Sequence, residues 1–229
     1  MKVQKKVLAT CFMVGVVLLF LLMSYRTQQH ASFQQWNLPL AGKVIIIDPG
    51  HGGIDGGATF SGVIEKNITL PISMKLRDYL QEQGALVLMT REKDEDLADS
   101  GSIRERKRAD LMKRTQFINN SAADLYISVH ANAFPQGNSK GAQTFYSPKY
   151  SENKQLAKLI QAEFISGLKN TKRQAKPLES VYLVKNATKP GVLVEVGFLS
   201  NDEERLKLQS KLYQDDVALS IYTGESDIF

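Results

Sequence analysis

The sequence has a single cysteine, Cys11, and only three histidines among its 229 residues. One cysteine excludes an intramolecular disulfide framework and a zinc ribbon built on cysteine pairs. The Gly-x-x-x-x-Gly-Lys-Ser/Thr motif of a phosphate-binding loop is also missing, which argues against a nucleotide-binding domain. At 43% hydrophobic and 23% charged residues, the composition is typical of a globular protein rather than a disordered chain.

Basic residues are in excess, but the excess is confined to the N-terminus. The formal net charge is +5, and the first 30 residues contribute +4 of it, from Lys2, Lys5, Lys6 and Arg26 with no acidic residue. A nucleic-acid-binding domain should carry a basic patch. The rest of the chain is nearly neutral, so we expect no nucleic-acid partner. We interpret the one basic tract there, residues 104–108, as a solvated helix face.

The N-terminus has the pattern of an export signal. Lysines precede residues 7–23, which are apolar apart from Thr10 and Gly15. At about 1.5 Å per residue this run spans roughly 25 Å, slightly less than a bilayer core of about 30 Å. No A-x-A-like cleavage site follows it. We therefore expect residues 1–25 to be an uncleaved signal anchor in the membrane, with cleavage and secretion as the alternative.

The rest of the chain divides into a tether and one domain. Residues 26–41 are polar and rich in glutamine, which is typical of a tether. Lysines on the cytoplasmic side of the anchor would place residues 42–229 outside the cytoplasm. Cys11 then lies in the membrane segment, and the exported domain has no thiol, which suits an oxidising exterior.

Within this domain, short apolar runs alternate with segments of helical periodicity. This alternation predicts a single α/β domain with a mostly parallel, twisted sheet of about six strands and helices on both faces. Strands are expected at 43–48, 85–90, 124–130, 142–146 and 192–196, with a short strand or loop at 181–184. Helices are expected at 65–83, 102–120, 151–168 and 201–222. Pro71 should either bend the first of these helices or delay its start to about Leu70. Ser102 and Asn201 are the expected N-caps of the second and the fourth helix.

Two of the three histidines directly follow buried strands. His51 and His130 each stand at the carboxyl end of an expected strand, where ligand sites form in sheets of this kind. His30 lies in the tether. A single histidine in such a place is most simply structural, but two at equivalent strand ends favour a shared site. Five glycines between residues 50 and 57 surround His51 and allow the backbone close to a ligand, or form a flexible turn.

Two carboxylates add to this pattern. Glu65 opens the first expected helix, where the helix dipole also favours an acid. Glu195 lies inside an apolar strand, so it is either paired or has a raised pKa. Two histidines and one carboxylate with an open fourth position form the ligand set of a catalytic zinc ion. In that interpretation His51, Glu65 and His130 bind Zn²⁺, and Glu195 is the base that accepts a proton from water.

The sequence resembles the zinc-dependent N-acetylmuramoyl-L-alanine amidases of the type 3 cell-wall hydrolase family. Four separate blocks carry the resemblance, over about residues 42–222: Asp48-Pro49-Gly50-His51-Gly52-Gly53-Ile54-Asp55-Gly56-Gly57-Ala58, Glu65-Lys66-Asn67, Ser128-Val129-His130-Ala131-Asn132-Ala133 and Val194-Glu195-Val196-Gly197-Phe198-Leu199-Ser200-Asn201. The resemblance implies that residues 42–229 are the catalytic domain.

The resemblance also implies roles for single residues. It places zinc on His51, Glu65 and His130 and makes Glu195 the catalytic carboxylate. Asp55 and Asn132 are candidates for orienting the metal ligands, since metal-bound histidines usually need such partners. Residues 91–124 are too short for the long blocking helix that some members insert before the second histidine.

The implied activity is hydrolysis of the amide between N-acetylmuramic acid and L-alanine in peptidoglycan. The short N-terminal segment without a wall-binding domain is most similar to sporulation members of the family, which implies a role in spore cortex maturation through muramic lactam. Two alternatives remain open: a zinc peptidase acting within the stem peptide, and a non-catalytic, membrane-tethered module that binds the wall. The residues point to no particular accessory protein.

Overall fold

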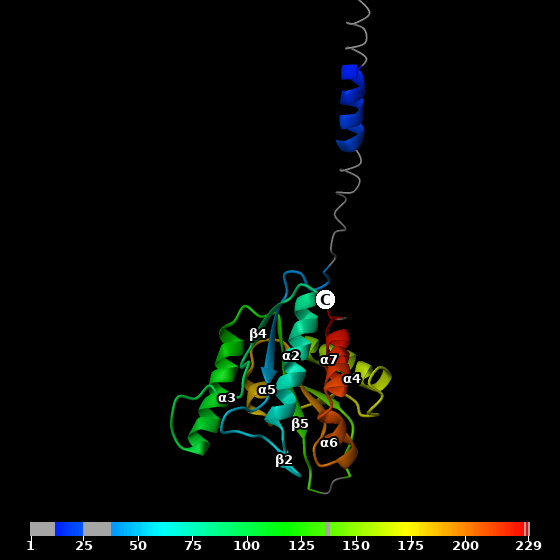
Figure 1. Cartoon of the computed structure of the whole chain (residues 1–229). Coiled ribbons are helices and arrows are strands. Elements are labelled where there is room, and N and C mark those ends of the chain that lie inside the picture. The colour runs from blue at the N-terminus through cyan, green and yellow to red at the C-terminus, as the bar shows by residue number, and fades with distance from the viewer. Residues whose placement is uncertain (1–11, 25–37, 136–137, 227, 229) are drawn as a thin grey trace, which may run out of the picture. The chain divides into compact units, whose positions relative to one another are not determined.

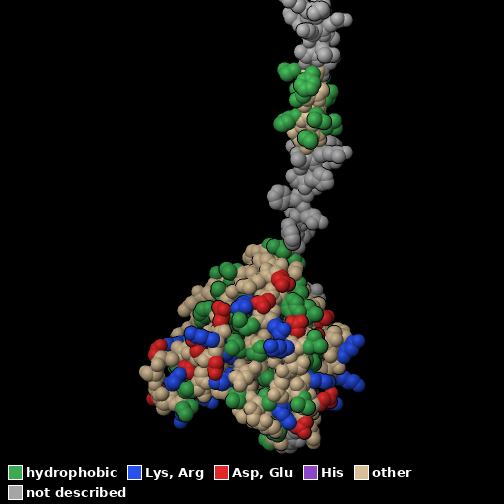
Figure 2. Space-filling model, in the orientation of Figure 1, with side chains coloured by type: hydrophobic (Ala, Val, Ile, Leu, Met, Phe, Trp, Pro, Cys, Tyr) green, Lys and Arg blue, Asp and Glu red, His purple; other side chains and the backbone are tan. Residues whose placement is uncertain are grey.

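The computed structural model describes residues 12–24, 38–135, 138–226 and 228. The chain divides into two units, Met1–Asn37 and Leu38–Phe229. In the first unit, residues 12–24 form a helix with exposed apolar side chains (Figure 2). Among the described residues, no helix combines the length and hydrophobicity that crossing a bilayer requires. Most of the expected anchor and tether, residues 1–11 and 25–37, lies outside the described residues.

The second unit is built on a six-stranded sheet with the order β4-β1-β5-β8-β6-β7. Strands β4 and β5 of this sheet are labelled in Figure 1. The expected mostly parallel sheet is confirmed, since β4, β1, β5 and β8 run parallel and only β6 pairs antiparallel, with β8. The strands are β1 (Val44–Pro49), β4 (Leu86–Met89), β5 (Leu125–Asn132), β6 (Gln143–Tyr146), β7 (Lys176–Pro177) and β8 (Gly191–Phe198). A separate hairpin joins β2 (Thr59–Phe60) to β3 (Val63–Ile64).

Helices cover both faces of the sheet. One face packs against α2 (Lys66–Glu82), α4 (Ser151–Ser166) and α7 (Lys211–Ser226) through a large apolar core. The other face packs against α3 (Ile103–Asn120) and α5 (Tyr182–Asn186) through a smaller cluster that includes Ile46, Ile118, Tyr126 and Leu183. Successive residues of β1 alternate between these cores, because side chains along a strand point to opposite faces. A short helix, α6 (Asp202–Leu208), follows β8.

Several details differ from the expectation. Residues 181–184 belong to neither a strand nor a loop but mostly to α5, because a short apolar run does not distinguish a strand from a buried helical turn. The helix expected at 201–222 is two helices. Asn201 caps α6 as expected, because its side chain accepts a hydrogen bond from the Glu204 amide. The helix ends at Leu208, whose carbonyl accepts a hydrogen bond from the Gln214 side chain of α7. The sequence also did not predict the hairpin β2–β3 or the edge strand β7.

The first helix tolerates its proline. α2 begins at Lys66 and continues through Pro71, so the expectation of a start near Leu70 is wrong. Buried side chains on both sides of Pro71, among them Ile68 and Ile72, hold the helix against the sheet and offset the lost hydrogen bond. In α3 the expected capping box is confirmed, with Ser102 and Glu105 satisfying each other's backbone amides.

Helix α7 carries a fully buried carboxyl, Glu225, whose two oxygens have no hydrogen-bond partner among the described residues. Burial raises its pKa from 4.5 to about 8, although the positive charge of Lys43 lowers it in part. In the unfolded chain this group ionises near pH 4.5, whereas in the folded chain it stays protonated until about pH 8. The free energy of unfolding therefore decreases as the pH rises through this interval.

We expect Glu225→Gln to remove this pH dependence. Relative to wild type, the variant should gain of the order of 2–4 kcal/mol in the free energy of unfolding between the two ends of the interval. Urea unfolding at several pH values measures this difference. The matched control is Glu179→Gln, which removes an exposed carboxylate and should give a curve parallel to wild type. If the free energy of unfolding of Glu225→Gln followed the pH in parallel with that of wild type, Glu225 would not be the group with the raised pKa.

Candidate metal centre

His51 follows β1 in a loop that needs glycine. His51 itself has a positive φ of 62°, and Gly50 lies so close to His130 that a Cβ on Gly50 would stand 2.5 Å from its ring. At Gly57, with φ +70°, a Cβ would be 2.5 Å from both the His51 ring and Glu65 Oε2. The glycines at positions 50 and 57 therefore let three side chains converge, and a larger residue at either position would push them apart.

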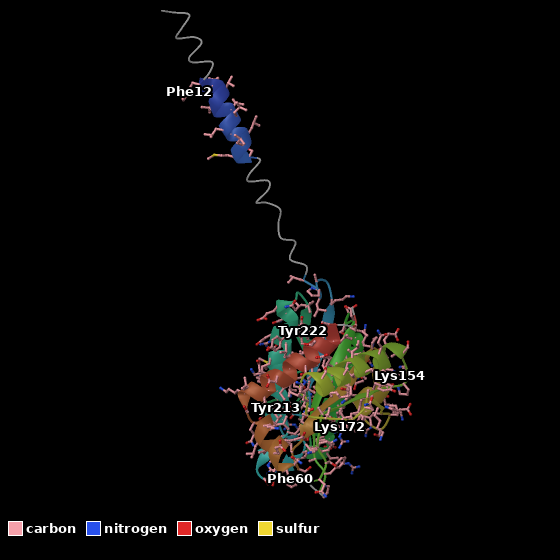
Figure 3. All side chains as sticks on the ribbon, turned by 90° about the vertical axis from the view of Figure 1, so that its right-hand side faces the viewer. Phe12, Phe60, Lys154, Lys172, Tyr213 and Tyr222 are labelled. Atoms are coloured by element: carbon pink, nitrogen blue, oxygen red, sulfur yellow. The ribbon has the colours of Figure 1, made fainter. Side chains whose placement is uncertain are left out.

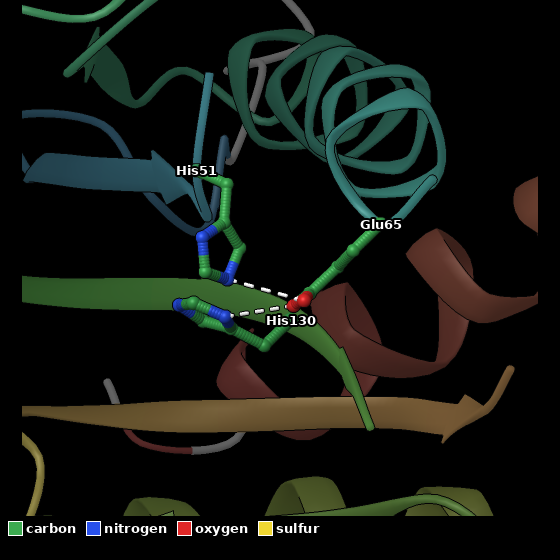
Figure 4. A group of neighbouring side chains, drawn as sticks. All are labelled: His51, Glu65 and His130. Atoms are coloured by element: carbon green, nitrogen blue, oxygen red, sulfur yellow. Dashed lines mark hydrogen bonds and ion pairs between the residues drawn. The ribbon is translucent and has the colours of Figure 1, made fainter. Parts of the chain in front are cut away.

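The structure brings His51, Glu65 and His130 together, as Figure 4 shows. His51 Nε2 lies 3.1 Å from Glu65 Oε2, and His130 Nδ1 lies 2.9 Å from Glu65 Oε1. The two imidazole rings meet edge to face with centroids 5.0 Å apart. One ligand atom from each residue lies within 4.8 Å of the others. Three segments, the end of β1, the start of α2 and the end of β5, supply one residue each.

Glu65 is held by backbone amides as well as by the two histidines. Its Oε2 accepts a hydrogen bond from the Ala58 amide at 2.7 Å, and its Oε1 accepts one from the Ala131 amide at 3.0 Å. Burial by itself raises the pKa of Glu65, but hydrogen bonds from His130 and His51 outweigh it and hold the pKa well below its usual range. The buried carboxyl is therefore ionised and fixed in orientation.

Asp55 orients His51 from the opposite side of the ring. Its Oδ2 lies 2.8 Å from His51 Nδ1, and its Oδ1 lies 2.7 Å from Lys107 Nζ on α3. A proton on Nδ1 leaves Nε2 as the atom directed at Glu65. Burial opposes protonation of His51, but the Asp55 and Glu65 carboxylates raise its pKa to about 9. The contact of Lys107 shows that the tract 104–108 is not purely a solvated face.

Among the described residues, the hydrogen bonds of Asn132 lead away from the three converging side chains. Its Oδ1 accepts from the amide of the next residue, Ala133, at 2.8 Å, and its carbonyl accepts from Leu199. Asn132 therefore shapes the turn after β5 rather than holding a ligand. The register between β5 and β8 shifts between His130 and Asn132, which interrupts the regular alternation of side chains at this point. The expected orienting role for Asn132 finds no support here.

Glu195 stands beside the two histidines on the neighbouring strand. It is directly opposite His130 in the β5–β8 register. Its Oε2 is buried and has no hydrogen-bond partner among the described residues, and burial raises its pKa to about 7. His51, His130 and Glu195 line the same cavity of about 270 Å³, which also has an apolar wall formed by Leu111, Val181, Leu183 and Leu193.

Two buried arginines, which sequence reasoning missed, hold the backbone of the His51 loop. Arg114 of α3 donates to the carbonyls of Pro49 and His51, both at 2.7 Å. Arg91 donates to the carbonyls of Pro49 and Gly50, both at 3.0 Å. Arg114 also pairs with Asp48 at 2.9 Å and with Asp110 at 2.7 Å, and all three side chains are almost completely buried. The signal in the sequence is the Asp110–Arg114 spacing of one helical turn.

The donors suit a divalent cation. Imidazole nitrogens and carboxylate oxygens are ligand types that zinc prefers, and the set of two imidazoles and one carboxylate opens on one side to the cavity. The unpartnered Oε2 of Glu195 supports this fit, because a buried polar atom normally has a partner. Fold and ligand set together have the features of metal-dependent hydrolases.

The chain belongs to the family of N-acetylmuramoyl-L-alanine amidases, whose model matches residues 45–225. It is 50% identical over 223 residues to the germination-specific N-acetylmuramoyl-L-alanine amidase of Bacillus subtilis, covering 96% of this chain and 94% of that protein. It is 32% identical to the N-acetylmuramoyl-L-alanine amidase LytC of the same organism, over 81% of this chain but only 35% of LytC.

Solved structures show the same fold. The CwlD amidase of Clostridioides difficile, solved in complex with the GerS lipoprotein, superposes with a TM-score of 0.80 at 40% identity, covering 82% of this chain and 98% of that chain. The catalytic domain of the amidase CwlV from Paenibacillus polymyxa superposes with a TM-score of 0.71 at 29% identity. The α/β architecture described above is therefore that of the amidase family.

Proposed function

We propose that this chain cleaves the amide between N-acetylmuramic acid and L-alanine in peptidoglycan, with zinc held by His51, Glu65 and His130. The single observation that carries the metal assignment is the convergence of two imidazoles on one buried carboxylate, beside the Oε2 of Glu195, which has no hydrogen-bond partner in the described part of the chain. Family membership and the 50% identity to a germination-specific amidase support the reaction and a role in the spore cortex.

A bound zinc ion would polarise the scissile carbonyl and make water more acidic. Glu195 is the proton carrier in the proposed reaction. Its Oε2 accepts a proton from the attacking water as the new C–O bond forms, and then delivers that proton to the L-alanine nitrogen as the C–N bond breaks. A pKa of about 7 suits both transfers near neutral pH. The products are a lactyl carboxyl on the sugar and a free amine on the stem peptide.

The remaining residues of the site keep this arrangement in place. Asp55 fixes the orientation of the His51 ring, and the amides of Ala58 and Ala131 fix Glu65. Arg114 holds the carbonyl of His51 itself. Because these contacts already fix the metal-binding side chains, the side chains lose little conformational freedom when a substrate binds.

The substrate of a cell-wall amidase lies outside the cytoplasm. We infer that residues 1–25 anchor the enzyme at the membrane and that residues 26–41 tether the catalytic domain of residues 42–229. The end of the tether already packs on the domain, since Leu40 is buried in its apolar core. This inference rests on the lysines and the apolar run of the sequence alone. The CwlD amidase of Clostridioides difficile was solved in complex with the GerS lipoprotein, so an accessory lipoprotein fits this placement for the present chain as well.

Product analysis tests the proposed reaction. Digestion of purified peptidoglycan by the full chain should release intact stem peptides with an L-alanine N-terminus, detected by N-terminal labelling and mass spectrometry. A stem peptidase has the same ligand set but leaves L-alanine on the sugar, and that outcome would replace the proposal. A wall-binding module would bind the sacculus and release nothing.

A further inference from the structure

A second hollow lies near the same edge of the sheet and is strongly basic. It has a volume of about 620 Å³. Its lining residues are Lys140, Lys169, Asn170, Thr171, Lys172 and Arg173, of which four are cationic and none is acidic. This cationic hollow stands out because the domain as a whole is nearly neutral, with charges of both signs interspersed on the face shown in Figure 2.

The cations of the hollow are available to a ligand. Among the described residues, Lys140, Lys169 and Lys172 take part in no ion pair. Lys169 and Lys172 are exposed, and Figure 3 shows Lys172 at the surface of the domain. The carboxylates of Glu203 and Glu204 offset part of the charge of Lys140 and Arg173, respectively, but among the described residues no acid pairs with Lys169 or Lys172. A cluster of cations with this excess of positive charge favours binding of an anion.

The floor of the hollow is rigid. Arg173 donates from Nε to the Lys140 carbonyl at 2.9 Å and from Nη1 to Gln143 Oε1 at 3.2 Å, and its guanidinium lies 4.9 Å from the centre of the Phe198 ring. The Nη2 of Arg173 has no partner within the described part of the chain. Buried Glu204 accepts from the Gly141 amide at 2.7 Å and so fixes the neighbouring turn. A fixed guanidinium with a free N–H is suited to a carboxylate.

A buried acceptor adds a second requirement. Asn170 donates from Nδ2 to Tyr213 Oη at 2.8 Å, but its Oδ1 is buried and has no partner among the described residues. Asn170 lines the hollow, so a shift of its side chain would let this oxygen accept a hydrogen bond from an N–H group of a ligand. With that shift the hollow offers cations to a carboxylate and an acceptor to an amide, and a peptide that bears free carboxylates presents both groups.

The hollow is connected to the site through the sheet register. Gln143 of β6 pairs directly with Glu195 of β8, so their side chains point to the same face. Because Arg173 bonds to the Gln143 side chain, the cationic hollow begins one strand away from the proposed catalytic carboxyl. Within peptidoglycan the stem peptide is the part that carries carboxylates and amides together, whereas the sugar rings are neutral.

We propose that Lys140, Lys169, Lys172 and Arg173 form a subsite for the carboxylates of the stem peptide. This proposal rests on the proposed amidase function. The subsite would hold the peptide beyond the scissile amide and leave the chemistry at Glu195 unchanged. It therefore acts on KM rather than on kcat.

The test compares two soluble muropeptides, one with free stem-peptide carboxylates and one with the same carboxylates amidated. For the free form, Lys169→Gln/Lys172→Gln should raise KM about fivefold with little change in kcat. The wild-type KM for this form should also rise with ionic strength, because salt screens exposed charges. The amidated form should have the same KM in both proteins. The matched control is Lys154→Gln/Lys158→Gln, which removes two exposed lysines of α4 and should leave KM unchanged (Lys154 is labelled in Figure 3).

The outcomes separate the two proposals. If the wild-type protein cleaves both muropeptides and Lys169→Gln/Lys172→Gln leaves KM for the free form unchanged, the subsite is wrong and the amidase function stands. An equal rise of KM for both forms also overturns the subsite, because the effect is then unrelated to the carboxylates. If the wild-type protein cleaves neither form at its lactyl amide, the proposed function fails first. Equal thermal unfolding of all variants shows that they are folded.

Discussion

Replacing Glu195 with glutamine is expected to lower kcat by about 10²- to 10⁴-fold while zinc content stays at the wild-type level. Glutamine keeps the size of the side chain but cannot accept and return a proton. Glu195 is not among the residues that converge as candidate ligands, so its loss leaves the metal set complete. Initial rates on a soluble muropeptide, together with metal analysis of the same samples, measure both effects.

The control for this variant is Glu152→Gln, an exposed carboxylate at the start of α4, which should keep full activity. Retained turnover in Glu195→Gln would show that another group carries the proton. Loss of zinc together with activity would instead make Glu195 part of the metal site. Either result contradicts the proposed division of roles between Glu195 and the three converging residues.

Arg114→Leu is expected to destabilise the domain strongly. The substitution leaves Asp48 and Asp110 buried without their shared cation and releases the carbonyls of Pro49 and His51. Breaking a buried ion pair from one side costs about 3–5 kcal/mol. For a domain of this size that corresponds to a Tm lower by roughly 6–20 °C. Thermal unfolding with zinc present measures the shift.

Arg108→Leu is the matched control, since Arg108 is an exposed arginine on the same helix. We expect its Tm to stay close to that of wild type. Arg114→Lys should keep the charge but lose the guanidinium group that reaches two carbonyls and two carboxylates. Its Tm should therefore lie between the Tm values of wild type and Arg114→Leu. A wild-type Tm in Arg114→Leu would show that the His51 loop does not depend on this cation.

The sequence predicted the α/β fold because its strands are apolar runs and its helices are periodic over many residues. It also placed His51 and His130 at the carboxyl ends of two strands and Glu195 inside a third strand, as the structure has them. Prediction was weaker where the apolar run was short. Leu183 and Val184 are buried in either a strand or a helix, and only the surrounding packing makes α5 a helix.

Contacts between distant segments were beyond prediction. The amide that binds Glu65 Oε1 comes from Ala131, and the carbonyl that binds Arg114 comes from His51. Nothing near Glu65 or Arg114 in the chain indicates these partners, because the packing of α2 and α3 against the sheet creates them. Asn132 differs for a local reason, because its side chain accepts a hydrogen bond from the amide of the next residue, Ala133, although its position near His130 favoured an orienting role.

The zinc content of the purified full chain tests the central claim most directly. After dialysis, elemental analysis should give one zinc per chain for wild type and for Glu195→Gln, and a large loss for His130→Ala, which removes one of three ligands. A wild-type protein that is active without zinc, or a His130→Ala variant that retains its zinc fully, would contradict the account.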